Sequence, residues 1–301
     1  PTPTTSSAAS DVYKRQIVQQ ADCVVFVGCR AGSVTTERWR YPAAGQAKII
    51  NIDSDPATIG AIYQTDVAIA GDARLALEAL ADAVSGAGAS RNAAGTVAAA
   101  KKAKFDVFQA LASSDDTPIK PERLVAAVNR VLDPDATVVC DPGTPCPYFS
   151  AFYRNPLTGR HFISNRAHGA LGYAMSAAVG AHIGRPGVKT VAVMGDGSFG
   201  FTCGELETVT RLNLPITFIV VSNSVFGWIK AGQRHGFDQR FYSVDFSRTD
   251  HAAVASAFGV KSWKVEDPAK LEGVLREAVA HDGPTLVDVI CQPLDEANAP
   301  V

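Results

Sequence analysis

The chain has 301 residues, enough for two ordinary domains, and 47% of them are apolar against 19% charged. This composition supports a buried core and excludes a disordered chain. A net charge of -2 without a long basic run argues against a nucleic-acid partner or an anionic membrane surface.

The apolar stretches and the cysteines indicate the cellular compartment of the protein. We find no signal peptide, and the longest apolar stretches are much shorter than the roughly 20 residues of a membrane-spanning helix. Six cysteines are scattered without a Cys-x-x-Cys pair, mostly in apolar, strand-like runs: Cys23, Cys29, Cys140, Cys146, Cys203 and Cys291. We expect a cytoplasmic protein with reduced, buried thiols.

The first 85 residues contain a tail and a sheet unit. Residues 1–16 are rich in small and polar residues and have no apolar periodicity, so we interpret them as a tail foreign to the fold. Cys23–Val27, Lys48–Asp53 and Val67–Ala70 are expected strands, and Asp72 should cap a helix that runs to about Val84. This alternation over 17–85 is typical of an open parallel α/β sheet, and 86–96 is the predicted linker.

A second α/β unit is predicted over 97–301. Helices are expected from Lys120-Pro121-Glu122, over Gly169–Ile183 and over Pro268–His281. The expected strands are short apolar runs: Thr137–Cys140, Thr190–Met194, Ile216–Val221, Val260–Val265 and Thr285–Ile290. The predicted fold class is therefore α/β, with two open parallel-sheet units.

Polar residues follow two of these strands. Gly195-Asp196-Gly197-Ser198 ends one strand, and Asn223 ends the next, 27 residues after Asp196. Ligands of open parallel sheets bind beyond the carboxyl ends of the strands, where glycines allow a phosphate to approach and N–H groups can donate to it. The oxygens of Asp196 and Asn223 suit Mg²⁺, which keeps phosphate oxygens and water in its shell.

This pattern resembles the signature of thiamine-diphosphate-dependent enzymes, Gly-Asp-Gly followed after about two dozen residues by Asn-Asn. Phe199–Thr208, Phe226–Lys230 and His168-Gly169-Ala170-Leu171-Gly172 also resemble segments of that superfamily, which includes acetolactate synthase, pyruvate oxidase and benzoylformate decarboxylase. The resemblance covers about Asp22 to Pro293. It implies a partial Rossmann-like middle domain over 17–85 and a complete diphosphate-binding domain over 97–301.

The resemblance also implies roles for single residues. Asp196, Asn223 and the Val225 carbonyl would hold Mg²⁺, and Gly197 and Ser198, in the motif that starts at Gly195, would bind the diphosphate of the cofactor. The two catalytic residues would be Gly169, accepting a hydrogen bond from the pyrimidine amino group, and Leu171, the apolar wedge that bends the cofactor. One departure is Ser222 in place of the first Asn; it affects a secondary hydrogen bond that a serine hydroxyl can still make.

The implied activity is that of a thiamine-diphosphate- and Mg²⁺-dependent 2-oxo acid decarboxylase or carboligase, a lyase or transferase resembling acetolactate synthase. The superfamily's remaining catalytic residue is a Glu in a separate pyrimidine-binding domain, which this sequence does not match. We therefore interpret the chain as a truncated C-terminal portion rather than a naturally split chain, and expect it to be inactive alone. Its partner would be a second copy or a chain that supplies the pyrimidine-binding domain.

Two alternative functions stay open at this point. Phe226–Lys230 and the nucleotide-like turn Gly28–Ser33 suggest a flavin-dependent enzyme of the pyruvate oxidase type that binds FAD. The chain could also be a non-catalytic module that holds thiamine diphosphate without turning it over. Ordinary structural roles compete for Leu171 as core, for His168, and for Glu205 and Glu207 as a solvated helical turn. Which 2-oxo acid is the substrate stays open.

Overall fold

The computed structural model describes residues 17–293 apart from 34, 37, 87–92 and 166–167. The chain divides into two compact units between Asp106 and Val107. All pairings between the strands described in the two sheets are parallel, which confirms the predicted α/β class with two parallel-sheet units. Among these residues, no helix is long and apolar enough to cross a membrane.

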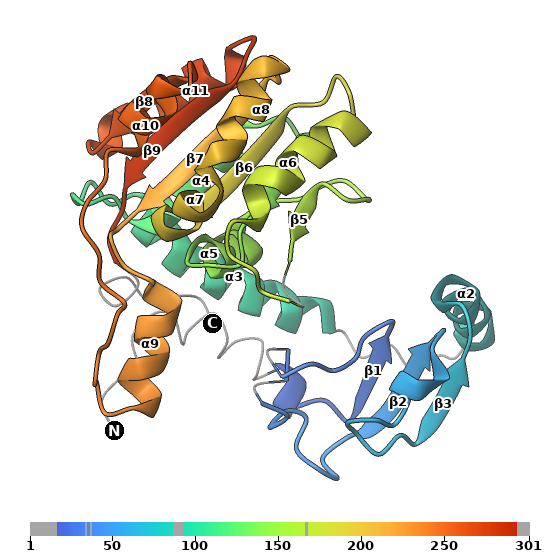
Figure 1. Cartoon of the computed structure of the whole chain (residues 1–301). Coiled ribbons are helices and arrows are strands. Elements are labelled where there is room, and N and C mark those ends of the chain that lie inside the picture. The colour runs from blue at the N-terminus through green and yellow to red at the C-terminus, as the bar shows by residue number, and fades with distance from the viewer. Residues whose placement is uncertain (1–16, 34, 37, 87–92, 166–167, 294–301) are drawn as a thin grey trace. The chain divides into compact units, whose positions relative to one another are not determined.

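The first unit is a three-stranded sheet in the order β1-β2-β3 (Figure 1). The predicted strands are confirmed as β1 (Cys23–Val27), β2 (Lys48–Asp53) and β3 (Val67–Ala70). A single turn of 3₁₀ helix, η1 (Pro56–Thr58), follows β2. The helix α2 (Ala73–Val84) begins as predicted, because the Asp72 carboxylate accepts a hydrogen bond from the Leu75 N–H at 3.0 Å.

The core of this first unit is small. One buried cluster among the described residues consists of Phe26, Ala31 and Ile49, and Ile52 of β2 is fully buried as well. Tyr63 stacks on Phe26 with ring centroids 5.6 Å apart. None of the described residues of α2 is buried, although its sequence is amphipathic. The first unit thus leaves a large share of its apolar side chains in contact with solvent.

The segment between the units differs from a plain linker. The helix α3 (Ala93–Ala112), which the sequence analysis does not predict, includes residues 93–96 of the expected linker 86–96. Most of the rest of that linker, and the whole segment 1–16, lie outside the described residues. The predicted domain limits therefore remain predictions.

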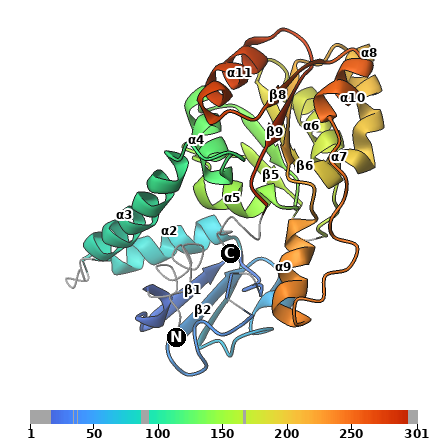
Figure 2. The ribbon, with the colours of Figure 1, turned by 90° about the vertical axis from the view of Figure 1, so that its left-hand side faces the viewer.

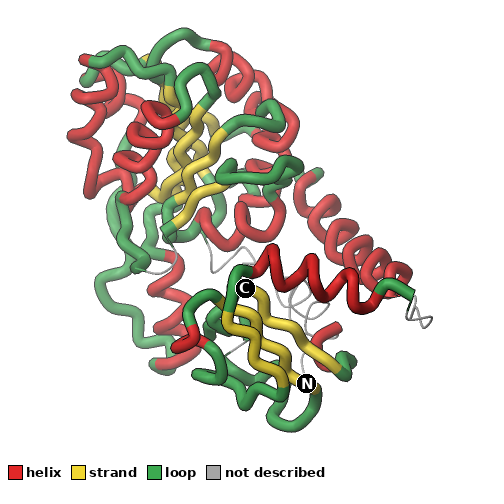
Figure 3. Tube along the Cα trace, turned by 90° about the vertical axis from the view of Figure 1, so that its right-hand side faces the viewer, coloured by secondary structure: helices red, strands yellow, loops and turns green. Residues whose placement is uncertain are grey.

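The second unit contains a six-stranded sheet in the order β5-β4-β6-β7-β9-β8. Its strands are β4 (Thr137–Cys140), β5 (Phe162–Ser164), β6 (Thr190–Gly195), β7 (Ile216–Ser222), β8 (Lys261–Val265) and β9 (Thr285–Ile290). Its helices are α4 (Pro121–Val131), α5 (Pro145–Phe152), α6 (Tyr173–Gly184), α7 (Asp196–Thr202), η2 (Cys203–Glu205), α8 (Leu206–Arg211), α9 (Gly227–Gly236), α10 (His251–Ala257) and α11 (Pro268–Ala280). Figure 3 shows helices on both sides of this sheet.

The two helical layers divide the core of the second unit. On one face, α6, α7, α8 and α10 pack on alternate side chains of the central strands, among them Met194, Phe218 and Leu286. On the other face lie α4, α5 and α11, with α4 beside α11 (Figure 2). Parallel strands covered on both faces are apolar throughout, which is why all seven residues of β7 are buried.

The predicted strands of this unit are confirmed, but one helix begins later than predicted. The helix expected from Gly169 begins at Tyr173, because Gly169 has φ +72° and Gly172 φ +87°, left-handed values that a right-handed helix cannot contain. A Cβ on Gly172 would also lie 2.8 Å from Thr202 Cγ2, so α6 starts against the end of α7. The short strand β5 and the helix α5 are absent from the sequence prediction.

The cysteine prediction holds only in part. All six cysteines, each of them described, are free thiols, as expected. Cys140, Cys146 and Cys291 are buried, but Cys23 is exposed, and Cys29 and Cys203 are partly exposed. Cys23 is exposed because it begins β1, which is an edge strand of the smaller sheet.

Candidate functional site

Two neighbouring strands of the larger sheet end in polar residues. β6 passes directly into α7, so Asp196 is the first helical residue at the carboxyl end of a central strand. β7 ends at Ser222 and is followed by Asn223. Because Gly195 pairs with Val221 in the parallel register, the two strand ends lie side by side. The fold therefore brings together the two parts of the motif that the sequence separates.

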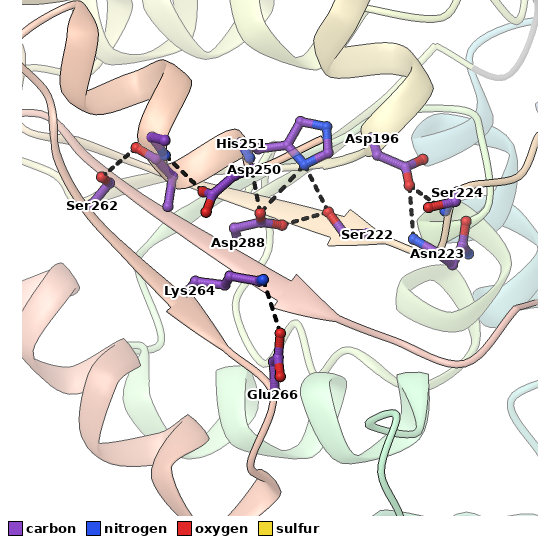
Figure 4. A network of polar contacts seen from close by, with 12 residues as sticks. Asp196, Ser222, Asn223, Ser224, Asp250, His251, Ser262, Lys264, Glu266 and Asp288 are labelled. Carbon is purple, nitrogen blue, oxygen red and sulfur yellow. Dashed lines mark hydrogen bonds and ion pairs between the residues drawn. The ribbon is translucent and has the colours of Figure 1, made fainter. Parts of the chain in front are cut away.

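The Asp196 carboxylate binds the turn that follows β7. Its Oδ2 accepts hydrogen bonds from the N–H groups of Asn223 at 2.7 Å and Ser224 at 2.6 Å (Figure 4). Its Oδ1 accepts one from the Gly197 N–H at 2.8 Å. Burial raises the pKa of Asp196, while these three donors and the nearby His251 favour its ionised form. A 5% exposed carboxylate thus ties both strand ends together.

Further backbone hydrogen bonds fix the turn after β7. Ser224 has φ +58°, and Asn223 Oδ1 accepts a hydrogen bond from the Val225 N–H at 3.3 Å. The Ser224 carbonyl accepts from the Phe246 N–H at 3.0 Å, and Val225 forms a bridge with Asp245. A non-glycine residue in the left-handed region costs free energy and persists only where surrounding contacts fix it. The backbone around Asn223 and Val225, two of the predicted metal ligands, is therefore well defined.

Gly197 is required by packing between the two segments. A Cβ at this position would lie 2.3 Å from Cε1 of Phe226, closer than any real contact. Phe226 follows the Asn223 turn directly and packs its ring at 6.4 Å from that of Phe201 in α7. The second glycine of the motif thus allows α7 and the turn after β7 to come together. Its N–H, predicted to donate to a diphosphate, donates to Asp196 here.

Asp141 is a functional candidate that the sequence analysis missed. It follows β4 directly, and its carboxylate accepts hydrogen bonds from Ser198 Oγ at 2.9 Å and from the Ala174 N–H at 3.2 Å. Asp141 is fully buried, and burial raises its pKa. A signal was present in the sequence, because Asp141 follows a strand in the same way as Asp196. Asp141 thereby joins the start of α6 to α7.

The predicted residues Leu171 and Ser198 converge on one point. A Cβ added to Gly143 would meet Leu171 Cδ2 at 3.3 Å and Ser198 Oγ at 3.6 Å, with the Asp141 carboxylate beside them at 3.8 Å. Leu171 is partly buried, so its side chain is not enclosed in the core of the unit. This exposure leaves Leu171 able to contact a ligand.

The remaining candidates divide between exposed and structural positions. Gly169 is exposed and lies in the segment before α6, where its N–H donates to the Asn165 carbonyl at 3.1 Å. His168 is exposed as well. Glu205 and Glu207 are exposed at the start of α8, and Glu207 pairs with Arg211 at 2.9 Å, which favours the solvated helical turn.

The donor set suits a metal that takes part of its shell from a ligand. Among the described residues, no group of three or more His, Cys, Asp or Glu side chains could hold a metal by itself. Asp196 and Asn223 supply hard oxygen donors, the type that Mg²⁺ prefers when phosphate oxygens complete its shell. Asn223 Nδ2 is buried and has no hydrogen-bond partner, an arrangement that typically costs about 1–3 kcal/mol. The residues present therefore fit Mg²⁺ with a diphosphate.

Buried negative charge accumulates at this edge of the sheet. Asp196, Asp288 and Glu122 are at most 5% exposed, and all three act with burial to raise the pKa of the Cys291 thiol. Within the described part of the chain, no Lys or Arg forms an ion pair with Asp196 or Asp288. Hydrogen bonds from backbone N–H groups, Ser222 and His251 satisfy these two carboxylates, and a bound cation could offset the remaining negative charge at this edge.

The fold and these polar residues define an α/β protein with a candidate ligand site at the carboxyl ends of its parallel strands. Two family models match the chain. "Thiamine pyrophosphate enzyme, C-terminal TPP binding domain" matches residues 141–289, and "Thiamine pyrophosphate enzyme, central domain" matches residues 6–80. The chain belongs to the thiamine pyrophosphate (thiamine diphosphate) enzyme superfamily. The central-domain match begins inside the segment 1–16 that we interpreted as a foreign tail.

Curated relatives with similar sequences are acetolactate synthases. The "Probable acetolactate synthase large subunit" of Methanococcus aeolicus is 29% identical over 293 residues, 92% of this chain and 48% of that protein. The acetolactate synthase of Bacillus subtilis (strain 168) is 32% identical over 292 residues, 94% of this chain and 49% of that protein. The acetolactate synthase large subunit of Parasynechococcus marenigrum is 29% identical over 279 residues, with coverages of 92% and 44%. The chain thus spans about half the length of the curated relatives it matches.

Proposed function

We propose that this chain supplies the diphosphate- and metal-binding side of a thiamine-diphosphate- and Mg²⁺-dependent enzyme that decarboxylates or ligates 2-oxo acids, as a lyase or transferase resembling acetolactate synthase. The observation that carries the proposal is the contact between the Asp196 carboxylate and the turn at Asn223, 27 residues later in the chain. This contact joins two hard oxygen donors at the carboxyl ends of adjacent parallel strands.

Each part of the proposed site has one task. Asp196, Asn223 and the Val225 carbonyl would hold Mg²⁺, and the backbone from Gly195 to Ser198 would face the diphosphate. Thiamine diphosphate, when bound, supplies the carbon nucleophile and electron sink that 2-oxo acid chemistry needs. Leu171 would press on the cofactor from its apolar side, and Gly169 would orient the pyrimidine ring through its carbonyl. Asp141 would hold the Ser198 hydroxyl in place.

Calorimetry with the full chain tests this proposal. Thiamine diphosphate is titrated into the protein with Mg²⁺ and, separately, with EDTA. Because Asp196 and Asn223 would reach the diphosphate only through the metal, we expect binding with Mg²⁺ and none with EDTA. Binding of equal strength under both conditions would rule out the proposed metal site.

The partner belongs to the same proposal. Apolar side chains next to the site are exposed, with Phe201 64%, Trp228 43% and Ile229 51% exposed in α7 and α9. Exposed apolar surface of this kind marks an interaction site. We propose that the surface formed by these side chains binds a second copy of the chain or a chain that carries the pyrimidine-binding domain. Light scattering at increasing concentration should show association, and a monomer at high concentration would contradict pairing with a second copy.

Turnover is expected only with that partner. The superfamily's pyrimidine-side Glu has no match in this sequence, and acid–base assistance of this type is worth about 10²–10⁴-fold. We expect CO₂ release from pyruvate by the purified chain, with excess thiamine diphosphate and Mg²⁺, to stay at the level of the free cofactor. Addition of a pyrimidine-binding domain should raise CO₂ release above the level of the free cofactor. Turnover by the chain alone would mean that another of its residues replaces the Glu.

A further inference from the structure

A buried serine, histidine and aspartate lie beside the residues of the proposed metal site (Figure 4). Ser222 is the last residue of β7, His251 the first of α10, and Asp288 lies within β9. Their exposed fractions are 6%, 6% and 0%. The Ser222 hydroxyl contacts His251 Nδ1 at 3.0 Å and donates a hydrogen bond to Asp288 Oδ1. The backbone N–H of His251 donates to Asp288 Oδ2 at 3.1 Å.

The hydrogen positions in this cluster follow from counting donors. Ser222 has one hydroxyl hydrogen, and it is donated to the Asp288 carboxylate. His251 Nδ1 must then carry a hydrogen and donate it to Ser222 Oγ, with Asp288 Oδ2 at 3.4 Å as a second acceptor. The three side chains therefore form a closed network in which Asp288 is the common acceptor.

This order of donors differs from that of a nucleophilic triad. In a Ser-His-Asp triad the histidine accepts the serine proton, and the carboxylate binds the other ring nitrogen. Here serine and the same ring nitrogen, Nδ1, both face Asp288, and all three residues are at most 6% exposed. The hydrogen bonds among Ser222, His251 and Asp288 therefore fix the positions of these three side chains.

His251 touches both segments that carry the proposed metal ligands. Its Nδ1 contacts Ser222, the residue directly before Asn223. Its ring also packs at a right angle against Phe199, with centroids 5.3 Å apart, and Phe199 lies in α7 one turn after Asp196. One buried side chain thus fixes the end of β7 and the start of α7 relative to each other.

From this geometry we infer that Ser222, His251 and Asp288 are positioning residues for the metal site, and that they set its affinity for Mg²⁺ by fixing the Asn223 turn against Asp196. The inference rests on the proposed function of Asp196 and Asn223. Residues that orient metal ligands typically change metal affinity 10–100-fold when they are lost.

Two variants remove the network with little change of shape. Ser222→Ala deletes the hydroxyl, and His251→Phe keeps a ring against Phe199 but loses the Nδ1 donor. His251→Asn is the conservative rescue, because its side-chain amide can donate from near the position of Nδ1. The matched control is Thr217→Val on the same strand, which deletes a buried hydroxyl that accepts from Thr285 at 2.9 Å. Thr217 is five residues from Ser222, about 17 Å along the strand.

Two measurements on the full chain separate positioning from general damage. The first is the Mg²⁺ concentration that gives half-maximal thiamine diphosphate binding in calorimetry. The second is hydrogen exchange of the Asn223 and Ser224 amides, the donors to Asp196, in the absence of metal and cofactor. We expect Ser222→Ala and His251→Phe to need 10–100-fold more Mg²⁺ and to exchange these amides faster. His251→Asn should recover most of both losses, and Thr217→Val should match the wild type.

The outcomes distinguish this inference from the proposed function. Unchanged Mg²⁺ dependence and unchanged exchange in Ser222→Ala and His251→Phe would overturn the inference while leaving the metal site intact. Equal losses in Thr217→Val would overturn it too, since they would reflect stability alone. If the wild type binds cofactor without metal, the proposed function fails, and the exchange rates still report whether the network holds the turn.

Discussion

The two edges of the six-stranded sheet are both polar and buried, yet they satisfy their polar groups differently. At the amino edge, four threonines are fully buried: Thr137, Thr190, Thr217 and Thr285. The Thr285 hydroxyl lies 2.9 Å from that of Thr217 and 3.1 Å from the Ala278 carbonyl. Arg185 donates to Thr137 at 2.6 Å.

At the carboxyl edge, the buried groups include three carboxylates beside the hydroxyls of Ser198 and Ser222: Asp141, Asp196 and Asp288. Hydroxyls can both donate and accept, so a row of threonines can close its hydrogen bonds within the protein. Ionised carboxylates only accept, and they keep their charge after every N–H donor is used. Three of the four threonine hydroxyls have partners within the protein, whereas the buried Thr190 hydroxyl has none among the described residues. The comparison teaches that the amino edge leaves at most an uncharged hydroxyl without a partner, whereas the carboxyl edge holds carboxylates whose charge a ligand can balance.

The largest effect should come from Asp196→Ala. This change removes a proposed metal ligand together with the acceptor of the Asn223 and Ser224 N–H groups. We expect Mg²⁺-dependent binding of thiamine diphosphate to weaken by more than about 100-fold, beyond the loss typical of residues that only orient ligands. Calorimetry measures it, with Thr217→Val at the opposite edge as the control. An affinity within twofold of wild type would contradict the difference between the edges.

A second prediction concerns how closely the two strand ends pack. In Gly197→Ala the new Cβ would lie 2.3 Å from Phe226 Cε1, so the ring must move. We expect the free energy of unfolding to fall by about 1–3 kcal/mol in chemical denaturation, as for other overpacked sites. Gly200→Ala in the same helix is the control, because nothing lies within 4 Å of its Cβ and alanine favours a helix. Equal stability of both variants would contradict the close approach.

These edges also show how far sequence reasoning reaches. All strands except the short β5, the Asp72 cap and the meeting of Asp196 with Asn223 could be predicted, since each depends on local patterns and on the rule that parallel strands end at one edge. The late start of α6 at Tyr173 could not, because it depends on Gly172 packing against Thr202 30 residues later.

The supporting carboxylates were missed for a similar reason. Asp141 contacts Ser198 57 residues later, and Ser222 contacts Asp288 66 residues later. No periodicity links such pairs, and a single Asp within an apolar strand has no local sign of its partner. Ser222 was recognised only as a departure from Asn-Asn, and the structure gives its hydroxyl a buried acceptor instead.

Leu171→Ala tests whether the carboxyl edge includes an apolar contact to the cofactor. Leu171 is partly buried beside Gly143 and Ser198, so its loss should cost less than the 2–5 kcal/mol typical of a fully buried leucine. We expect about tenfold weaker cofactor binding, roughly 1.4 kcal/mol, with a smaller change in the free energy of unfolding. Leu212→Ala, at a 48% exposed position, is the control. Lower stability with unchanged binding would instead mark Leu171 as ordinary core.

The smallest effect is expected at the amino edge, at Lys189. Among the described residues of this edge, Lys189 is the cation whose pKa is clearly shifted. Its Nζ donates to the Pro215 carbonyl at 3.0 Å, and burial lowers the pKa of Lys189 from 10.5 to about 8, against the attraction of Asp282. Between about pH 8 and 10.5 the unfolded chain holds a proton that the folded chain has lost, so this residue makes stability rise with pH in that window. Lys189 is partly solvated, which reduces the contribution to about 1 kcal/mol.

Lys189→Met should remove that rise, because methionine keeps the apolar stem without the charge. Urea unfolding at pH 7.5 and pH 10 measures the difference between variant and wild type, so that other titrating groups cancel. We expect the variant to gain stability relative to wild type at pH 7.5 and to lose this advantage at pH 10. Cofactor affinity should stay unchanged, since Lys189 precedes β6 and Asp196 follows it, at opposite ends of the strand. A parallel pH dependence in both proteins would show that burial of Lys189 carries no cost, and a change in cofactor affinity would show that the two edges are coupled.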